Sequence, residues 1–268
     1  MTDKIDLPAS NTLDVLRQAL IVITAPLIWL FSSLGFFLSH ARSPSDFSDL
    51  SVNILVPQTF AFSIWLPIFI GIFAYSIVQA LPANRARLAF RQSGWWMVAG
   101  LGGVALWGLV TAFAPNSSVE VLASLVFIPA MLSLVIAMIK VWQHKADLKP
   151  HENWLVLIPV SLIAGWCSIA IFVGFNGLIW KTVEPIGWSI TGTALSVLGL
   201  ALWWVIYVLR QQAMNSAYAF PVVWGLGCLA VRHFAEGGDI WIGSAAIIGS
   251  IAAILAALIK HRPNPTAS

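Results

Sequence analysis

Large aromatic side chains recur on one face of a long apolar stretch in the first third of the chain. Spacings of three and four residues place side chains on the same side of a helix. The residues that share this face are Phe62, Trp65, Phe69, Phe73 and Ser76. Their rings offer flat π surfaces against which a flat ring system can stack. Ordinary helix packing or lipid contact would use the same pattern, so the spacing leaves both interpretations open.

A second set of residues with ligand-binding chemistry comprises Trp107, Trp166 and Asn176. Trp166 and Asn176 are ten residues apart in one apolar stretch, which places them about 80° apart around a helix. Both side chains could therefore line one pocket, although they lie on neighbouring faces of the helix. A buried asparagine must be hydrogen-bonded, and a ligand carboxylate, a water molecule or a neighbouring hydroxyl would serve.

Several other kinds of chemistry are not indicated. Ionisable side chains are missing from the centres of the apolar stretches, where proton and ion pathways usually place them. The GxxxxGK[ST], HExxH and GxSxG patterns do not occur in the sequence, and both cysteines, Cys167 and Cys228, fall inside apolar runs. The sequence therefore argues against a proton-coupled pump, and we name no catalytic residue, no metal site and no obligatory cofactor.

The elements that must position these residues are membrane helices. Hydrophobic residues make up 59% of the 268 residues and charged residues only 9%, whereas a soluble domain carries roughly 25% charged residues. This composition excludes a soluble enzyme and a nucleic-acid-binding module, and the lipid bilayer is the expected partner of the chain. A helix of about 20 apolar residues crosses the hydrocarbon core. We expect an all-α polytopic membrane helix bundle of about eight spans: 16–38, 60–81, 95–114, 119–141, 154–180, 188–209, 217–234 and 240–259.

The seventh of these spans has the weakest signal, because it is short and contains Pro221. With eight spans both termini lie on one side of the membrane. That side carries eleven of the fourteen lysines and arginines, and the other side carries Arg42, Lys181 and Arg232. Because cytoplasmic loops are enriched in basic residues, we expect both termini to be cytoplasmic. A bacterial inner membrane is the expected location.

Two segments carry a recognisable family pattern. Residues 57–65, PQTFAFSIW, open the second expected span. They resemble the P-x-x-[YW]-A-F-[SG]-I-W entry to the second helix of the TspO/MBR family, the tryptophan-rich sensory proteins related to the mitochondrial translocator protein. Residues 154–159, WLVLIP, are followed by 166–170, WCSIA, and then by Asn176 and Trp180. This order is similar to the fifth helix of that family.

The resemblance covers roughly residues 16–180, and the chain looks like a long form of the family. It implies two parts, a five-helix TspO-like membrane bundle in residues 1–182 and a three-helix C-terminal membrane extension in residues 183–268. Because the family pattern lies before the extension, we expect the ligand pocket to lie wholly within the first part.

The resemblance also implies a function. Family members are implied to bind porphyrins, sterols and related flat apolar molecules inside the five-helix bundle, under a partial cover from the first loop. A porphyrin or haem-like tetrapyrrole is therefore the candidate ligand here, with a sensory, transport or protective role. The implied ligand-binding residues are Phe62, Trp65, Trp107, Trp166 and Asn176.

Two other functions stay open at this point. One is a transporter or permease for a small apolar metabolite, which the proline-containing spans at Pro67, Pro159 and Pro221 allow. The other is a light-dependent porphyrin-degrading enzyme, so enzymatic activity is left undecided.

Two further features of the sequence have alternative explanations. On the outer side, four residues could receive ligand carboxylates at a pocket mouth or could be solvated loop residues: His40, Arg42, Arg232 and His233. In the last span, small residues recur four apart, for example at Ala253 and Ala257. They permit close helix packing, either within the chain or at the seam of a homodimer.

Overall fold

A computed structural model describes residues 11–50, 52–211 and 215–259, and every regular element in these ranges is helical. The long helices are α1 (Thr12–Ser32), α4 (Trp65–Ala80), α5 (Leu88–Ala112), α6 (Glu120–Gln143), α7 (Ile158–Val183), α8 (Ile190–Arg210), α9 (Ser216–Ala235) and α10 (Ile240–Leu258). The short ones are α2 (Leu34–Phe37), α3 (Pro44–Ser48), η1 (Thr59–Ile64), η2 (Pro82–Asn84), η3 (Ser117–Val119), η4 (Lys145–Asp147), η5 (Asn153–Leu157) and η6 (Glu184–Ile186).

Seven of the long helices in the described ranges are long and apolar enough to cross a membrane. The helix that does not qualify is α9, which carries Arg232 and His233 in its last turn and Pro221 inside. It corresponds to the span with the weakest sequence signal, and it packs against α10 on one side and α7 on the other. The expected all-α polytopic membrane bundle is confirmed.

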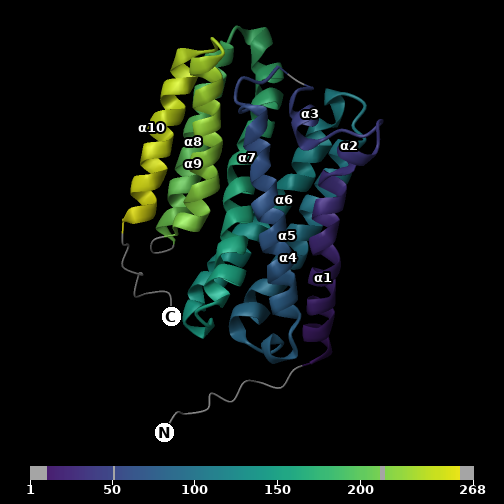
Figure 1. Cartoon of the computed structure of the whole chain (residues 1–268). Helices are drawn as coiled ribbons and strands as arrows, with labels where there is room; N and C mark the ends of the chain where they lie inside the picture. Colours follow the sequence, from purple (N-terminus) through teal and green to yellow (C-terminus); the bar gives the residue numbers. More distant parts are fainter. Residues whose placement is uncertain (1–10, 51, 212–214, 260–268) are drawn as a thin grey trace.

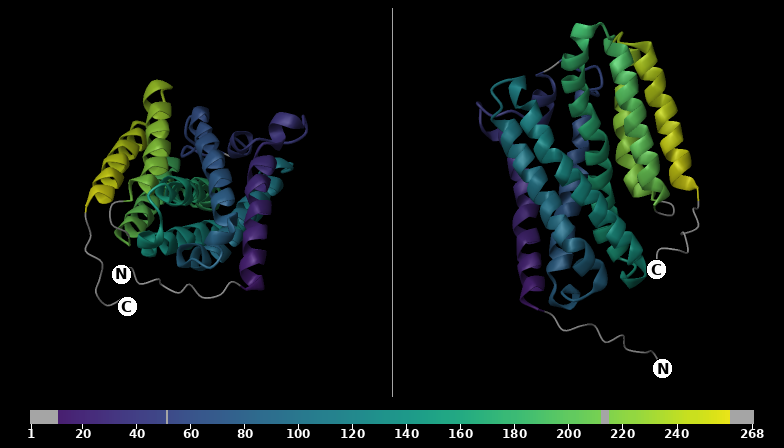
Figure 2. Two further views of the ribbon diagram at one scale, coloured as in Figure 1. Left: turned by 60° about the horizontal axis from the view of Figure 1, so that its bottom comes forward. Right: turned by 180° about the vertical axis from the view of Figure 1, so that it is seen from behind.

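Helix α7 lies at the centre of the bundle, in contact with α4, α6, α8 and α9. On one side of it, α6, α5 and α1 follow in succession, while α8, α9 and α10 form a group on the other side (Figures 1 and 2). Helix α1 starts from, and helix α10 runs towards, the same end of the bundle (Figure 1). We refer to this end as the base-rich end and to the opposite end, which carries α2 and α3, as the loop end.

Two helix boundaries differ from those expected. Helix α1 ends at Ser32, because the chain breaks at Ser33 before the short helix α2. Helix α5 begins at Leu88, earlier than the apolar stretch suggests, and so includes Arg91. The charge of Arg91 is compensated by Asp14 of α1, with Nε donating to Oδ1 over 3.0 Å. Hydropathy alone cannot anticipate such a pair, because it treats each charge as unpartnered.

Close helix approach depends on small residues. At Gly165 of α7, an added Cβ would collide with the carbonyl oxygen of Tyr218, so only glycine lets α9 come this near. On α10, a row of buried small residues faces the rest of the chain, and Gly249 contacts Leu202 of α8. The small-residue face of the last span therefore packs within the chain.

Candidate functional site

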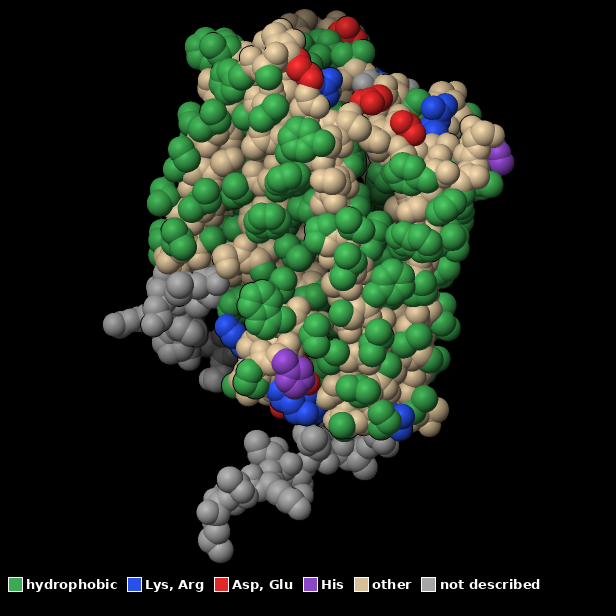
Figure 3. Space-filling view, viewed as in Figure 1, with side chains coloured by type: hydrophobic (Ala, Val, Ile, Leu, Met, Phe, Trp, Pro, Cys, Tyr) green, Lys and Arg blue, Asp and Glu red, His purple; other side chains and the backbone are tan. Residues whose placement is uncertain are grey.

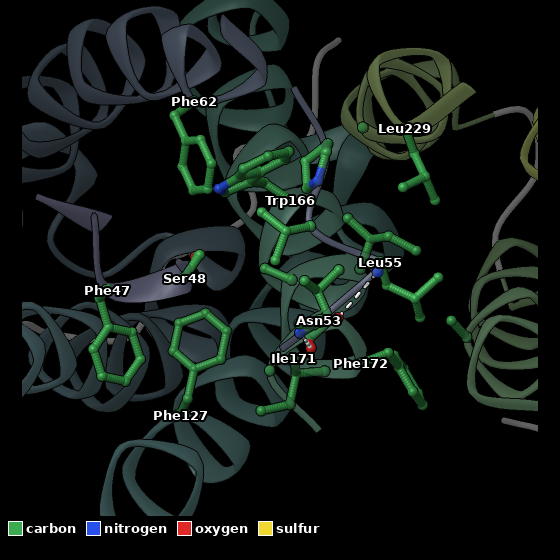
Figure 4. Close-up of a pocket in the computed structure, with 18 of the residues that line it drawn as sticks. Phe47, Ser48, Asn53, Leu55, Phe62, Phe127, Trp166, Ile171, Phe172 and Leu229 are labelled. Atoms are coloured by element: carbon green, nitrogen blue, oxygen red, sulfur yellow. Dashed lines mark hydrogen bonds between the residues drawn. The ribbon is translucent and has the colours of Figure 1, made fainter. Parts of the chain in front are cut away.

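An internal cavity of about 110 Å³ lies in the half of the bundle nearest the loop end. It is enclosed by η1 and the start of α4, the end of α5, the start of α6, and the middle parts of α7, α8 and α9. Its walls are mostly apolar, and several aromatic rings face it (Figure 4). Part of the wall comes from residues 52–58, which follow α3 and which we call the cover segment.

One aromatic wall is formed by Phe62, Trp65 and Trp166. Trp166 meets both other rings edge-on, with centroid distances of 6.2 Å to Phe62 and 6.4 Å to Trp65. Trp65 is only 6% exposed and Trp166 only 4%, and Trp65 also stacks on Phe69 at 5.3 Å. Edge-on contacts of this kind hold rings in fixed orientations, so the wall is pre-formed.

A second aromatic wall lies on the α5–α6 side of the cavity. The rings of Trp107 and Phe127 have centroids 5.0 Å apart, and Phe47 of α3 meets Trp107 edge-on at 6.4 Å. Phe47 and Phe127 lie together, away from the Phe62–Trp166 pair (Figure 4). A flat ring system between the two walls would have aromatic surface on both sides.

Asn176 does not line the cavity. Its Nδ2 donates to Oδ1 of Asn53 over 2.8 Å, and Asn53 in turn donates to the carbonyl oxygen of Val173 over 2.6 Å. Asn53 does line the cavity and belongs to the cover segment. Asn176 therefore holds the cover segment against α7. The other four predicted residues, Phe62, Trp65, Trp107 and Trp166, all face the cavity; their contact with a ligand stays a prediction.

Helix α9 also holds the cover segment. Arg232 donates to the carbonyl oxygen of Val56 over 2.6 Å, and Nε2 of His233 lies 2.8 Å from that of Ile54. The backbone N–H of Asp239 donates to Nδ1 of His233, which fixes Nε2 as the protonated nitrogen. Arg232 and His233, two of the four outer residues with alternative explanations, thus donate to backbone carbonyl oxygens.

The other two outer residues, Arg42 and His40, contact the chain around the end of α5. Nε of Arg42 donates to the carbonyl oxygen of Ala114 over 2.9 Å, so this arginine ties the first loop to the end of α5. The ring of His40 stacks on Phe113, with centroids 5.9 Å apart. Neither side chain lines the cavity.

The cavity is not confined to residues 1–182, whereas the placement of the ligand pocket wholly within those residues stays a prediction. Leu198 and Ala201 of α8 and Gly225, Leu226 and Leu229 of α9 contribute to its walls. These residues carry no signal in the sequence, because they are apolar positions on apolar helices. Their role arises from the direct packing of α8 and α9 against α7.

One face of α6 lines the cavity and was not predicted, although the sequence contains a pattern that indicates it. Glu120, Ser124 and Phe127 line the cavity and are spaced four and three residues apart, as one helix face requires. Glu120 is only 6% exposed, and its Oε2 accepts a hydrogen bond from Nζ of Lys181 over 3.0 Å. An acidic residue at the start of an apolar span, followed by this spacing, would have pointed to the face.

The base-rich end of the bundle is closed by buried ion pairs. Arg87 makes a two-pronged contact with Glu152, at 2.7 and 2.8 Å. Burial alone raises the pKa of a carboxyl, but the hydrogen bonds that Glu152 accepts from Arg87 and from the backbone N–H of Lys149 outweigh it. The pKa of Glu152 therefore lies below its ordinary value of 4.5. The hydrogen bond to Glu152 likewise raises the pKa of Arg87.

Fold and site together define an integral membrane helix bundle with an aromatic cavity. The sequence matches the family model described as TSPO-like protein over residues 18–259, and the chain belongs to this family. Among curated proteins and among solved structures, nothing matches. The matched stretch includes α8, α9 and α10; the division into a five-helix part and an extension stays a prediction.

Proposed function

We propose that this protein binds a flat apolar ligand in the aromatic cavity, with a sensory or protective role. The observation that carries the proposal is that four aromatic residues from different parts of the chain line one cavity: Phe62, Trp65, Trp107 and Trp166. Aromatic walls with few polar groups are typical of small-molecule sites. We also propose that the base-rich end is cytoplasmic, since basic residues favour that side.

The volume of the cavity limits the size of the ligand that it can hold without rearrangement. Drug-sized ligands occupy pockets of roughly 300–1,000 Å³, and a dry apolar cavity of about 150 Å³ admits benzene. The cavity here, at about 110 Å³, suits a small ring system with little rearrangement. A porphyrin or haem-like tetrapyrrole would enter only if the cover segment moved away. The cover segment is held by hydrogen bonds to α7 and α9, so such movement breaks no covalent bond or ion pair.

Binding is favoured over transport by the state of the base-rich end. Passage through the bundle would require that end to open and the buried Arg87–Glu152 pair to separate. The proposal therefore does not include a permease, and it includes no enzymatic step.

The first test compares two tryptophans by titration of the protein in detergent with protoporphyrin, followed by quenching of tryptophan fluorescence. Trp166→Ala removes a ring from the cavity wall and should weaken binding about tenfold, since stacking adds about 0.5–1.5 kcal/mol to the burial of the ring. Trp203→Ala is the control, because Trp203 is 65% exposed and lies outside the cavity. Equal affinities of the two variants for protoporphyrin would contradict the placement of the ligand in the cavity.

A second pair of variants adds a large side chain to α9, in one variant inside the cavity and in the other outside it. An added Cβ at Gly225 points towards Trp166, whereas one at Gly227 meets nothing within 4 Å. Gly225→Leu should therefore reduce binding at least as strongly as Trp166→Ala, and Gly227→Leu should leave it unchanged. Loss of binding in Gly227→Leu alone would place the ligand elsewhere on α9.

A further inference from the structure

The turn between α6 and α7, residues 144–152, separates its charged side chains by sign. Glu152 is only 1% exposed and accepts both prongs of the Arg87 guanidinium, and Oδ2 of Asp147 lies 3.9 Å from Nε of the same arginine. Lys145 and Lys149, by contrast, are exposed. Neither lysine forms an ion pair with a residue that the structure describes. The turn therefore presents two ammonium groups on its surface, while its carboxylates are held by Arg87.

The same arrangement extends over the base-rich end. Asp14, the remaining carboxylate described there, is only 4% exposed and pairs with Arg91, whereas Arg210 is exposed. The loop end has the opposite arrangement, because Arg42 and Arg232 donate to backbone carbonyl oxygens. The carboxylates exposed at the loop end are Asp46, Asp49, Glu184 and Glu236 (Figure 3). Anions are therefore attracted to the base-rich end and repelled from the loop end.

Two tryptophans indicate the depth of the turn in the membrane. Indole side chains favour the level of the lipid headgroups, and Trp154, which follows the turn, is 72% exposed. Before the turn, Nζ of Lys145 lies 4.6 Å from the centroid of the Trp142 ring, a cation–π contact. The two lysines therefore lie at the level of the lipid phosphates, with aromatic side chains on the side of the acyl chains.

We propose that the 144–152 turn is a docking surface for the headgroup of an anionic bilayer lipid, with Lys145 and Lys149 in contact with its phosphate. Basic residues next to a membrane helix attract anionic lipids in this way. A zwitterionic lipid would bring a choline cation to the same surface, where the two ammonium groups repel it. The proposal goes beyond ligand binding in the aromatic cavity, since the cavity lies in the other half of the bundle.

The test compares two lipids with the same acyl chains, dioctanoylphosphatidylglycerol and dioctanoylphosphatidylcholine. The full chain in detergent micelles is titrated with each lipid, and native mass spectrometry resolves the protein with and without one bound lipid. Each lysine near an anionic headgroup contributes about fivefold in affinity. The anionic lipid should therefore bind at least about fivefold more tightly than the zwitterionic one.

A pair of double variants assigns this preference to the turn. Lys145→Gln with Lys149→Gln removes both charges, so the affinity for phosphatidylglycerol should fall at least about fivefold, while that for phosphatidylcholine should not change. Lys145→Arg with Lys149→Arg is the matched control, because it changes the same positions and keeps both charges. This control should retain the preference for phosphatidylglycerol.

Three results would overturn the proposal. Equal affinities of the wild-type protein for the two lipids would mean that the turn does not select anionic headgroups. An unchanged affinity of the glutamine double variant for phosphatidylglycerol would place the anionic lipid elsewhere on the protein. Displacement of the bound lipid by an equal concentration of glycerol phosphate would indicate a site for a soluble phosphate compound. The comparison of the two lipids on the wild-type protein is decisive even if a variant does not fold.

Discussion

The base-rich end and the loop end of the bundle are held closed by different kinds of interaction. At the base-rich end, charged side chains of different segments pair with one another, as in Arg87–Glu152 and Arg91–Asp14. At the loop end, the ion pair between Lys181 and Glu120 joins α7 to α6, whereas the cover segment is held by side chains that donate to its backbone carbonyl oxygens, as Arg232 does to Val56. Charged side chains gather at both ends, with a hydrophobic surface between them (Figure 3).

This difference has a consequence for ligand entry. Removing one partner of a buried ion pair costs about 3–5 kcal/mol, whereas an ordinary hydrogen bond contributes about 0.5–1.5 kcal/mol. Each hydrogen bond of the cover segment can therefore break at lower cost than the loss of one partner of the buried ion pair. The cavity lies in the half nearest the cover segment, so we expect ligands to enter and leave at the loop end.

The largest change in the free energy of unfolding is expected from disrupting the buried ion pair at the base-rich end. Arg87→Ala leaves Glu152 as a buried, uncompensated carboxylate and should lower the free energy of unfolding by about 3–5 kcal/mol. Arg87→Lys keeps the charge but not the two-pronged geometry, and its loss should be smaller. Thermal unfolding in detergent measures both, with Glu184→Gln as an exposed control. A change below about 1 kcal/mol for Arg87→Ala, as is typical of surface pairs, would contradict the comparison.

Low pH should also weaken the Arg87–Glu152 pair, with a smaller decrease in the free energy of unfolding. Because the pKa of Glu152 is lowered in the folded protein, the unfolded chain binds the proton more readily. The stability from this carboxylate is therefore complete above about pH 4.5, its ordinary pKa, and is lost as the pH falls from there through the lowered value. Melting curves between about pH 6 and pH 3 should show the loss in the wild-type protein. In Glu152→Gln this contribution should be missing at every pH; an identical pH profile would exclude Glu152 as the source.

The smallest change in stability is expected at the loop end. Arg232→Gln shortens the side chain that holds Val56, and the free energy of unfolding should fall by only about 1 kcal/mol. The cover segment is then held less firmly, so the dissociation rate of a bound ligand should rise several-fold, measured by stopped-flow fluorescence. Arg210→Gln, at an exposed position of the base-rich end, should change neither quantity. Unchanged ligand kinetics in Arg232→Gln would argue against entry beneath the cover segment.

Much of the fold and part of the site could be predicted from local patterns. Hydropathy locates the long helices to within a few residues, because each must cover the hydrocarbon core by itself. The spacing of Phe62 and Trp65, together with the family pattern around Trp166, identifies the aromatic wall that the structure brings together. The start of α5 at Leu88 escapes such prediction, because the charge of Arg91 is compensated by a residue far away in the sequence, Asp14.

The sequence by itself determined which segments form membrane helices, which end of the bundle is basic, and which aromatic residues share a helix face. Only the tertiary structure decided that α8 and α9 complete the cavity, that Arg232 and His233 hold the cover segment, and that Asn176 lies behind it. The reason is physical. In lipid, apolar helices gain no hydrophobic free energy by meeting one another, so their neighbours depend on detailed fit, as where Gly165 admits the backbone of Tyr218. Periodicity along one helix carries no information about that fit.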